Sequence, residues 1–218
     1  MKFQTRSHDG DALITTDFAA IPILQKRGAI VLNVLVPGPT DEPRGAMAQT
    51  ADDVDQPTYQ EYQVPPKGDE MQVYLVGQEG PCHWATTVRL RATDERGIPE
   101  VFVGFDVAVR SRVPLDRVRA SYLITAPPAH LEWQMDSGVC VGFDGGVFQF
   151  VMERDPEAPE GTRIDIEPID DRSMRACATF SAPKLSRSLR LMYGFIISDY
   201  RATPSTCGLS PLRSGGKE

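Results

Sequence analysis

The stretch VFVGFDVAVRSRVPLDRVRASYLI, residues 101–124, decides the fold class of this chain. Its first nine residues are the most β-prone of the sequence, because valine and phenylalanine are enriched in strands. We expect a turn at the PLDR of residues 114–117, where proline pre-sets the backbone for a turn position. The chain then returns with apolar side chains at alternating positions: Val118, Ala120, Tyr122 and Ile124. Since alternate residues of a strand share one face, the stretch predicts two strands joined by a turn.

The same period of two recurs on both sides of this stretch. Residues 83–92 place Trp84, Thr86, Val88 and Leu90 on one face, and residues 189–195 do so with Leu189, Leu191, Tyr193 and Phe195. A hairpin turn is expected at Asp144-Gly145-Gly146, because glycine adopts positive φ without steric cost. No segment has a sustained helical period. The pattern predicts an all-β, two-sheet antiparallel β-sandwich.

The length of 218 residues and the distribution of prolines suggest one domain. We predict a single sandwich domain over residues 1–204 and a loose Ser/Gly-rich tail over 205–218. Residues 28–36 form an almost continuous apolar run, typical of a strand buried on both faces. The following residues 37–68 are acidic and interrupted by prolines, which favours a long acidic loop.

The charge of the chain excludes some classes of partner. Its formal net charge is −7, and unaided binding to nucleic acid requires clustered Lys and Arg, so we expect no nucleic-acid partner. The longest apolar run is too short to span a bilayer, and no signal peptide is evident, so we expect no membrane partner and a soluble, cytoplasmic protein. The four cysteines are expected to be free thiols, with Cys140 and Cys177 as small core residues. The oligomeric state stays open.

Catalytic and cofactor motifs are absent from the sequence. It has no nucleophile elbow, phosphate-binding glycine loop or dinucleotide fingerprint. The three histidines and four cysteines lack metal-ligand spacing, so we expect no metal and no cofactor. Carboxylates are numerous, and two of them at the right separation would suffice for a glycosidase, but the sequence does not show which of them are close in space.

The two tryptophans give the most suggestive pattern for binding, because exposed indoles stack on sugar rings while carboxylates and amides bind sugar hydroxyls. Each has polar neighbours: His83 beside Trp84, and Glu132 and Gln134 beside Trp133. The alternative for each tryptophan is a place in the sandwich core. The candidate binding residues are Trp133, Glu132, Asp136, Trp84 and His83.

Two stretches carry a family resemblance. Residues 101–124 and residues 189–204, LRLMYGFIISDYRATP, together resemble the galactose-mutarotase-like β-supersandwich domains that accompany glycoside hydrolases and polysaccharide lyases. The resemblance covers a small part of the chain and implies no functional residue. It implies a supersandwich-like fold and an association with carbohydrate.

Three hypotheses for function follow. The first is a non-catalytic β-sandwich binding or accessory module, holding a glycan or a protein partner on a sheet face or loop rim. The second is a structural or assembly subunit of the phage or capsid type, for which all-β domains are suited. The third is a glycoside hydrolase or lyase that uses two carboxylates.

Overall fold

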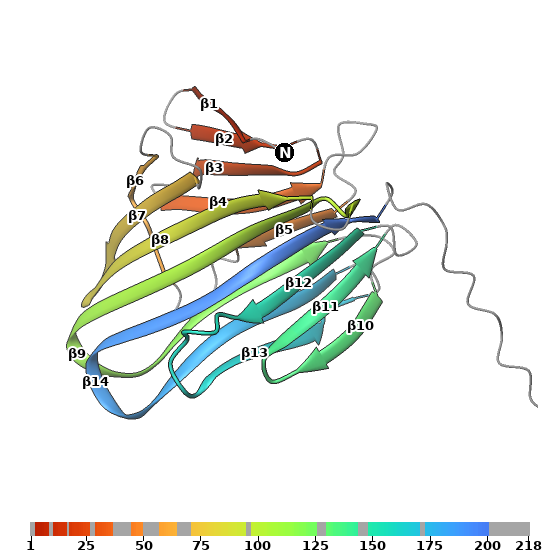
Figure 1. Cartoon of the computed structure of the whole chain (residues 1–218). Coiled ribbons are helices and arrows are strands. Elements are labelled where there is room, and N and C mark those ends of the chain that lie inside the picture. Colours follow the sequence, from red (N-terminus) through yellow and green to blue (C-terminus); the bar gives the residue numbers. More distant parts are fainter. Residues whose placement is uncertain are drawn as a thin grey trace, which may run out of the picture.

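The computed structural model describes residues 3–8, 11–16, 18–26, 29–36, 45–49, 57–64, 71–94, 97–125, 130–143, 148–170 and 173–200. These residues form strands in antiparallel pairs (Figure 1), as the sequence predicted. The strands are β1 (Gln4–His8), β2 (Asp11–Thr15), β3 (Ala20–Lys26), β4 (Ala29–Val36), β5 (Gly45–Gln49), β6 (Glu61–Gln63), β7 (Met71–Glu79), β8 (Cys82–Thr93), β9 (Glu100–Thr125), β10 (His130–Met135), β11 (Gly138–Phe143), β12 (Phe148–Arg154), β13 (Thr162–Pro168) and β14 (Ser173–Asp199).

Two long strands, β9 and β14, organise the fold. They pair with each other along almost their whole length, from Glu100↔Ser198 to Thr125↔Ser173, and both bend at the same end of the molecule (Figure 1). The turn predicted at residues 114–117 is therefore wrong: the chain bends there and continues as one strand. The register between β9 and β14 shifts between Ser181 and Ser188, and such irregularities allow paired strands to bend sharply.

The bend divides the strands into two layers. The first sheet contains, in order, β6, β7, β8, the first half of β9, the second half of β14, β12, β11 and β10. The second sheet contains β1 to β5, the second half of β9, the first half of β14, and β13. The predicted two-sheet antiparallel sandwich is confirmed, with the addition that both sheets share their two central strands.

The core lies between the two sheets and is built from the alternating faces read in the sequence. Residues 84–90, 118–124 and 189–195 bury the expected side chains. Aromatic rings meet at the centre: Phe105 stacks on Tyr193 at 4.9 Å between ring centres, and Tyr122 of the second sheet meets Phe195 edge-on at 4.7 Å. The hydroxyl groups of Tyr122 and Tyr193 share a hydrogen bond of 2.7 Å inside this cluster.

Hydrogen bonds also join the two sheets along their sides. On one side the backbone N–H of Ile30 donates to the carbonyl of Tyr59 at 2.7 Å, and that of Gln60 donates to Val76 at 2.9 Å. On the other side Ile164 N–H donates to the carbonyl of Asp136 at 3.1 Å. These contacts fix the spacing of the layers.

Some predicted loops contain strands. Residues 37–68 include β5 and β6, so the single long acidic loop predicted there is wrong for the described part. Met47 of β5 is buried beside Ile124. The small residues around Met47 give a weak strand signal, and pairing with β4 and β9 supplies the stabilisation. The strands β1 to β3, with His8 at the end of β1, also lie where no strand was predicted. The predicted tail at residues 205–218 and the turn at 144–146 lie outside the described residues.

Candidate functional site

Trp133 lies on β10, the edge strand of the first sheet, and 38% of its surface is exposed. The register between β10 and β11 shifts between Leu131 and Trp133, which marks a β-bulge. A bulge sets two residues against one on the partner strand, so Glu132 and Trp133 both oppose Cys140. Cys140 is buried but stands apart from the inter-sheet core, between the core residues Val139 and Val141. Its side chain, and with it Glu132 and Trp133, therefore faces the outer side of the first sheet.

A chain of hydrogen bonds surrounds Glu132. The amide nitrogen Nε2 of Gln149 donates to Glu132 Oε2 at 2.6 Å, and the thiol of Cys140 donates to the same oxygen at 3.4 Å. The hydroxyl of Tyr200 donates to Oε1 of Gln149 at 3.1 Å. A carboxylate, an amide and a phenol are thereby fixed on one face beside an exposed indole.

The thiol of Cys140 is held in its protonated form in this setting. Burial raises its pKa from 9.0 to about 12, and the neighbouring Glu132 carboxylate adds to the shift in the same direction. Since the thiolate is the reactive form, Cys140 stays a protonated hydrogen-bond donor at neutral pH. Its role at this site is to hold Glu132.

The remaining predicted residues lie elsewhere. Trp84 is buried in the core, with 5% of its surface exposed, so it cannot stack on a ligand. His83 is exposed on the outer side of β8, and β9, β14, β12 and β11 separate it from β10. Asp136 is exposed in the turn after β10, where its backbone carbonyl binds Ile164. The fold thus brings Trp133 and Glu132 together, places Asp136 at the nearby turn, and leaves the Trp84–His83 pair distant.

Trp133 is one end of a row of side chains that crosses the outer face of the first sheet. We call this set the transverse row. Each member is the Cα partner of the next on the neighbouring strand, and from β8 to β10 the members are Arg91, Phe102, Ile196, Val151, Cys140 and Trp133. Phe102, Ile196 and Val151 are half-buried. The middle of the row, Phe102, Ile196 and Val151, is therefore an apolar strip, with Arg91 beyond one end of it and Trp133 beyond the other.

The neighbouring rows differ on the two sides of this strip. On one side Gln149 and Glu100 present polar groups, and the buried hydroxyl of Ser198 between them donates to Glu100 at 3.1 Å. On the other side lies a row that includes Gly104 and Gly194. A Cβ on either glycine would come within 2.7 Å of the Phe102 ring, so the absence of side chains there allows the ring to lie over both residues.

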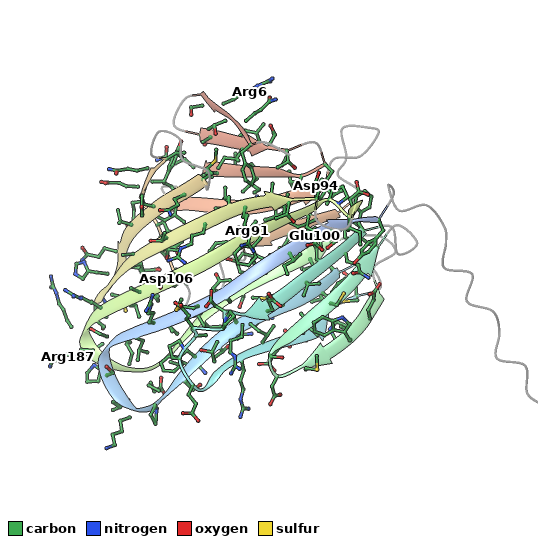
Figure 2. The ribbon with its side chains drawn as sticks, viewed as in Figure 1. Arg6, Arg91, Asp94, Glu100, Asp106 and Arg187 are labelled. Atoms are coloured by element: carbon green, nitrogen blue, oxygen red, sulfur yellow. The ribbon has the colours of Figure 1, made fainter. Side chains whose placement is uncertain are left out.

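Figure 2 labels charged residues on this face, among them Arg91, Glu100 and Asp106. Glu100 begins β9, Asp106 lies near the middle of the first half of that strand, and Arg91 of β8 lies between them along the sheet. Asp106 is paired with Arg190, whose Nη2 and Nε bind its two oxygens at 2.6 and 2.7 Å. Arg91 has its guanidinium carbon 5.5 Å from the centre of the Phe102 ring, a cation–π contact.

No family model matches the chain, and no curated protein matches it either. Within the described ranges, no helix has the length and apolar character needed to cross a membrane. The described residues likewise contain no group of three or more His, Cys, Asp or Glu side chains that could hold a metal ion.

Sequence reasoning missed most of the residues that share this face with Trp133 and Glu132. Gln149, Cys140, Tyr200 and Phe102 come from four separate strands or strand ends, and only the pairing register brings them to one face. The alternation in β12 carried part of the signal, because Phe148 and Phe150 point inward and so direct Gln149 outward. A shallow hollow of about 260 Å³ beside β6, lined by Gln25, Ile30, Gln60, Glu61, Tyr62 and Gln63, contains none of these residues.

Proposed function

We propose that this chain is a non-catalytic binding module that holds a carbohydrate on the outer face of its first sheet. The observation that carries the proposal is the exposed indole of Trp133 beside the hydrogen-bonded Glu132 and Gln149. An indole offers a flat apolar surface for the C–H face of a sugar ring, and its rigidity keeps the entropic cost of binding low.

The polar groups beside Trp133 support a sugar rather than an apolar ligand. Glu132 accepts hydrogen bonds, while Gln149 can both donate and accept, so together they complement a sugar hydroxyl. Their mutual hydrogen bonds hold them in place before a ligand arrives. Preorganisation of this kind raises affinity because less side-chain freedom is lost on binding.

The proposal is tested by affinity electrophoresis and calorimetry against a panel of soluble polysaccharides. We expect Trp133→Ala to weaken binding by about tenfold, which corresponds to ~1.4 kcal/mol. Tyr74→Ala is the matched control, since Tyr74 is also an exposed aromatic on the first sheet (41% exposed) but lies on β7, at the opposite side of the sheet. Binding that Trp133→Ala leaves intact, or no binding to any polysaccharide, contradicts the proposal.

A second function, hydrolysis of a glycosidic bond, is favoured by the place of Glu153 on β12, which lies opposite Gly194 and Gly138 in the row beside the apolar strip. Burial raises the pKa of its carboxyl group above the ordinary value, and the nearby Asp155 adds a smaller shift in the same direction. A carboxyl group that keeps its proton at higher pH suits a general acid, and a second carboxylate close by suits the base or nucleophile. Release of reducing ends that Glu153→Gln abolishes supports this function; release unchanged by that substitution excludes Glu153 as the acid.

A further inference from the structure

Two arginines on β8 lie at the far end of the transverse row from Trp133. Arg89 and Arg91 are separated by one residue, so their side chains share the outer face, and both are exposed. No carboxylate of the described residues lies within ion-pair distance of either guanidinium, whereas Arg190 on the same face is paired with Asp106. The β8 end of the row therefore carries two positive charges in a protein whose net charge is −7.

The cation–π contact orients Arg91. With its guanidinium over the Phe102 ring, the group is held against the sheet while its N–H donors remain available at the edges. A guanidinium held in this way can bind a planar carboxylate or a sulfate through two parallel hydrogen bonds. Arg89 lies on the same face two residues before Arg91, opposite Gly104, over which the Phe102 ring lies, and it can approach the same anion.

The spacing of the row suits an extended ligand. Five strand-to-strand steps separate β8 from β10, which gives about 24 Å at the usual spacing of ~4.8 Å. Between the ends, Phe102, Ile196 and Val151 form the apolar strip; Gln149 and Glu100 lie along one side of it, and Glu153 lies in the row on the other side. A linear oligosaccharide laid across the strands would meet an apolar floor under its rings and polar groups along both sides.

We infer that the ligand is an anionic oligosaccharide that lies along the transverse row, with one ring on Trp133 and an acidic group on Arg89 and Arg91. This inference rests on the proposed function and adds the charge, direction and length of the ligand. The acidic group is a carboxylate or a sulfate, because a guanidinium binds both through the same pair of donors.

The test compares three hexasaccharides by calorimetry: a neutral one, a uronic-acid one and a sulfated one. We expect one of the two acidic probes to bind at least tenfold more tightly than the neutral probe at low salt, with the advantage falling as ionic strength rises. The acidic probe that binds more tightly identifies the acidic group. The Arg89→Gln/Arg91→Gln variant should lose the preference while keeping its affinity for the neutral probe.

The control is Arg110→Gln, since Arg110 is also exposed on the outer face of the first sheet but lies outside the transverse row. All substitutions are at exposed positions, and unchanged thermal midpoints will verify folding. A neutral probe that binds as tightly as the acidic ones, or a preference that survives the double substitution, overturns the inference and leaves the proposed function standing. If none of the probes binds, both are overturned.

Discussion

Tyr59, Tyr122 and Tyr193 are buried in the core, and this burial should make the protein unfold in alkali. Burial raises the pKa of each hydroxyl group above its ordinary value of 10.0. Above pH 10 the unfolded chain releases these protons while the folded protein keeps them. The unfolded state then binds fewer protons, so the free energy of unfolding falls as the pH rises; below pH 10 the three groups have no effect.

The size of the effect follows from the number of groups. Each tyrosine that keeps its proton only in the folded state lowers the free energy of unfolding by about 1.4 kcal/mol per pH unit. Three of them give a slope of about 4 kcal/mol per pH unit. Two pH units would then remove roughly 8 kcal/mol, which is comparable to the whole stability of an ordinary domain.

The assay is urea unfolding, followed by tryptophan fluorescence, at several pH values between 8 and 11. The Tyr122→Phe/Tyr193→Phe variant should reduce the slope above pH 10 by about 3 kcal/mol per pH unit, because two of the three groups are gone. Cys140, whose pKa is raised to about 12, contributes in the same direction to both proteins and cancels in the comparison. Tyr74→Phe, at an exposed position, is the control. Equal slopes for wild type and the double variant would refute the reasoning.

Three further outcomes are expected. Tyr193→Phe alone should lower the free energy of unfolding at pH 7 by about 1–3 kcal/mol, because the buried Tyr122 hydroxyl loses its partner. The double Phe variant should lose less than the sum of the two single variants, and additive losses in urea unfolding would contradict this coupling. Gly77→Ala should destabilise the protein more than Gly104→Ala does. A Cβ on Gly77 meets the backbone at Tyr59 Cα (2.7 Å), whereas one on Gly104 meets a half-buried Phe102 ring that can rotate. Equal thermal midpoints for the two variants exclude this account. Cys140 should resist alkylation at pH 8 and should react faster in the Glu132→Gln variant, because the carboxylate that helps to raise the thiol pKa is gone. Mass spectrometry of the labelled peptides measures both rates, and an unchanged rate contradicts the role of Glu132.

The inward faces of the strands could be predicted from the sequence, and the site only in part. Alternation placed Val88 and Leu90 on one face of their strand, and both are buried, because hydrophobic burial dictates one face of a strand directly. The residues that share the outer face with Trp133 depend on pairing register and on the bulge between Leu131 and Trp133, which no local pattern encodes. Proline at position 114 suggested a turn, whereas the pairing of β9 with β14 on both sides of the bend carries the strand through.

The shared central strands also determine the order in which this molecule can assemble. β9 is paired with residues near the end of the described chain: Glu100 and Ser198, which are 98 positions apart, lie opposite each other. Neither layer is continuous until β14 is in place, although the hairpin of β7 and β8 needs only neighbouring residues. Contacts of such long sequence separation slow folding, because the entropy of closing a long loop is lost before they form. On the ribosome, we expect both sheets of the nascent chain to stay incomplete until β14 has been synthesised. Until then their strand edges are exposed to other chains.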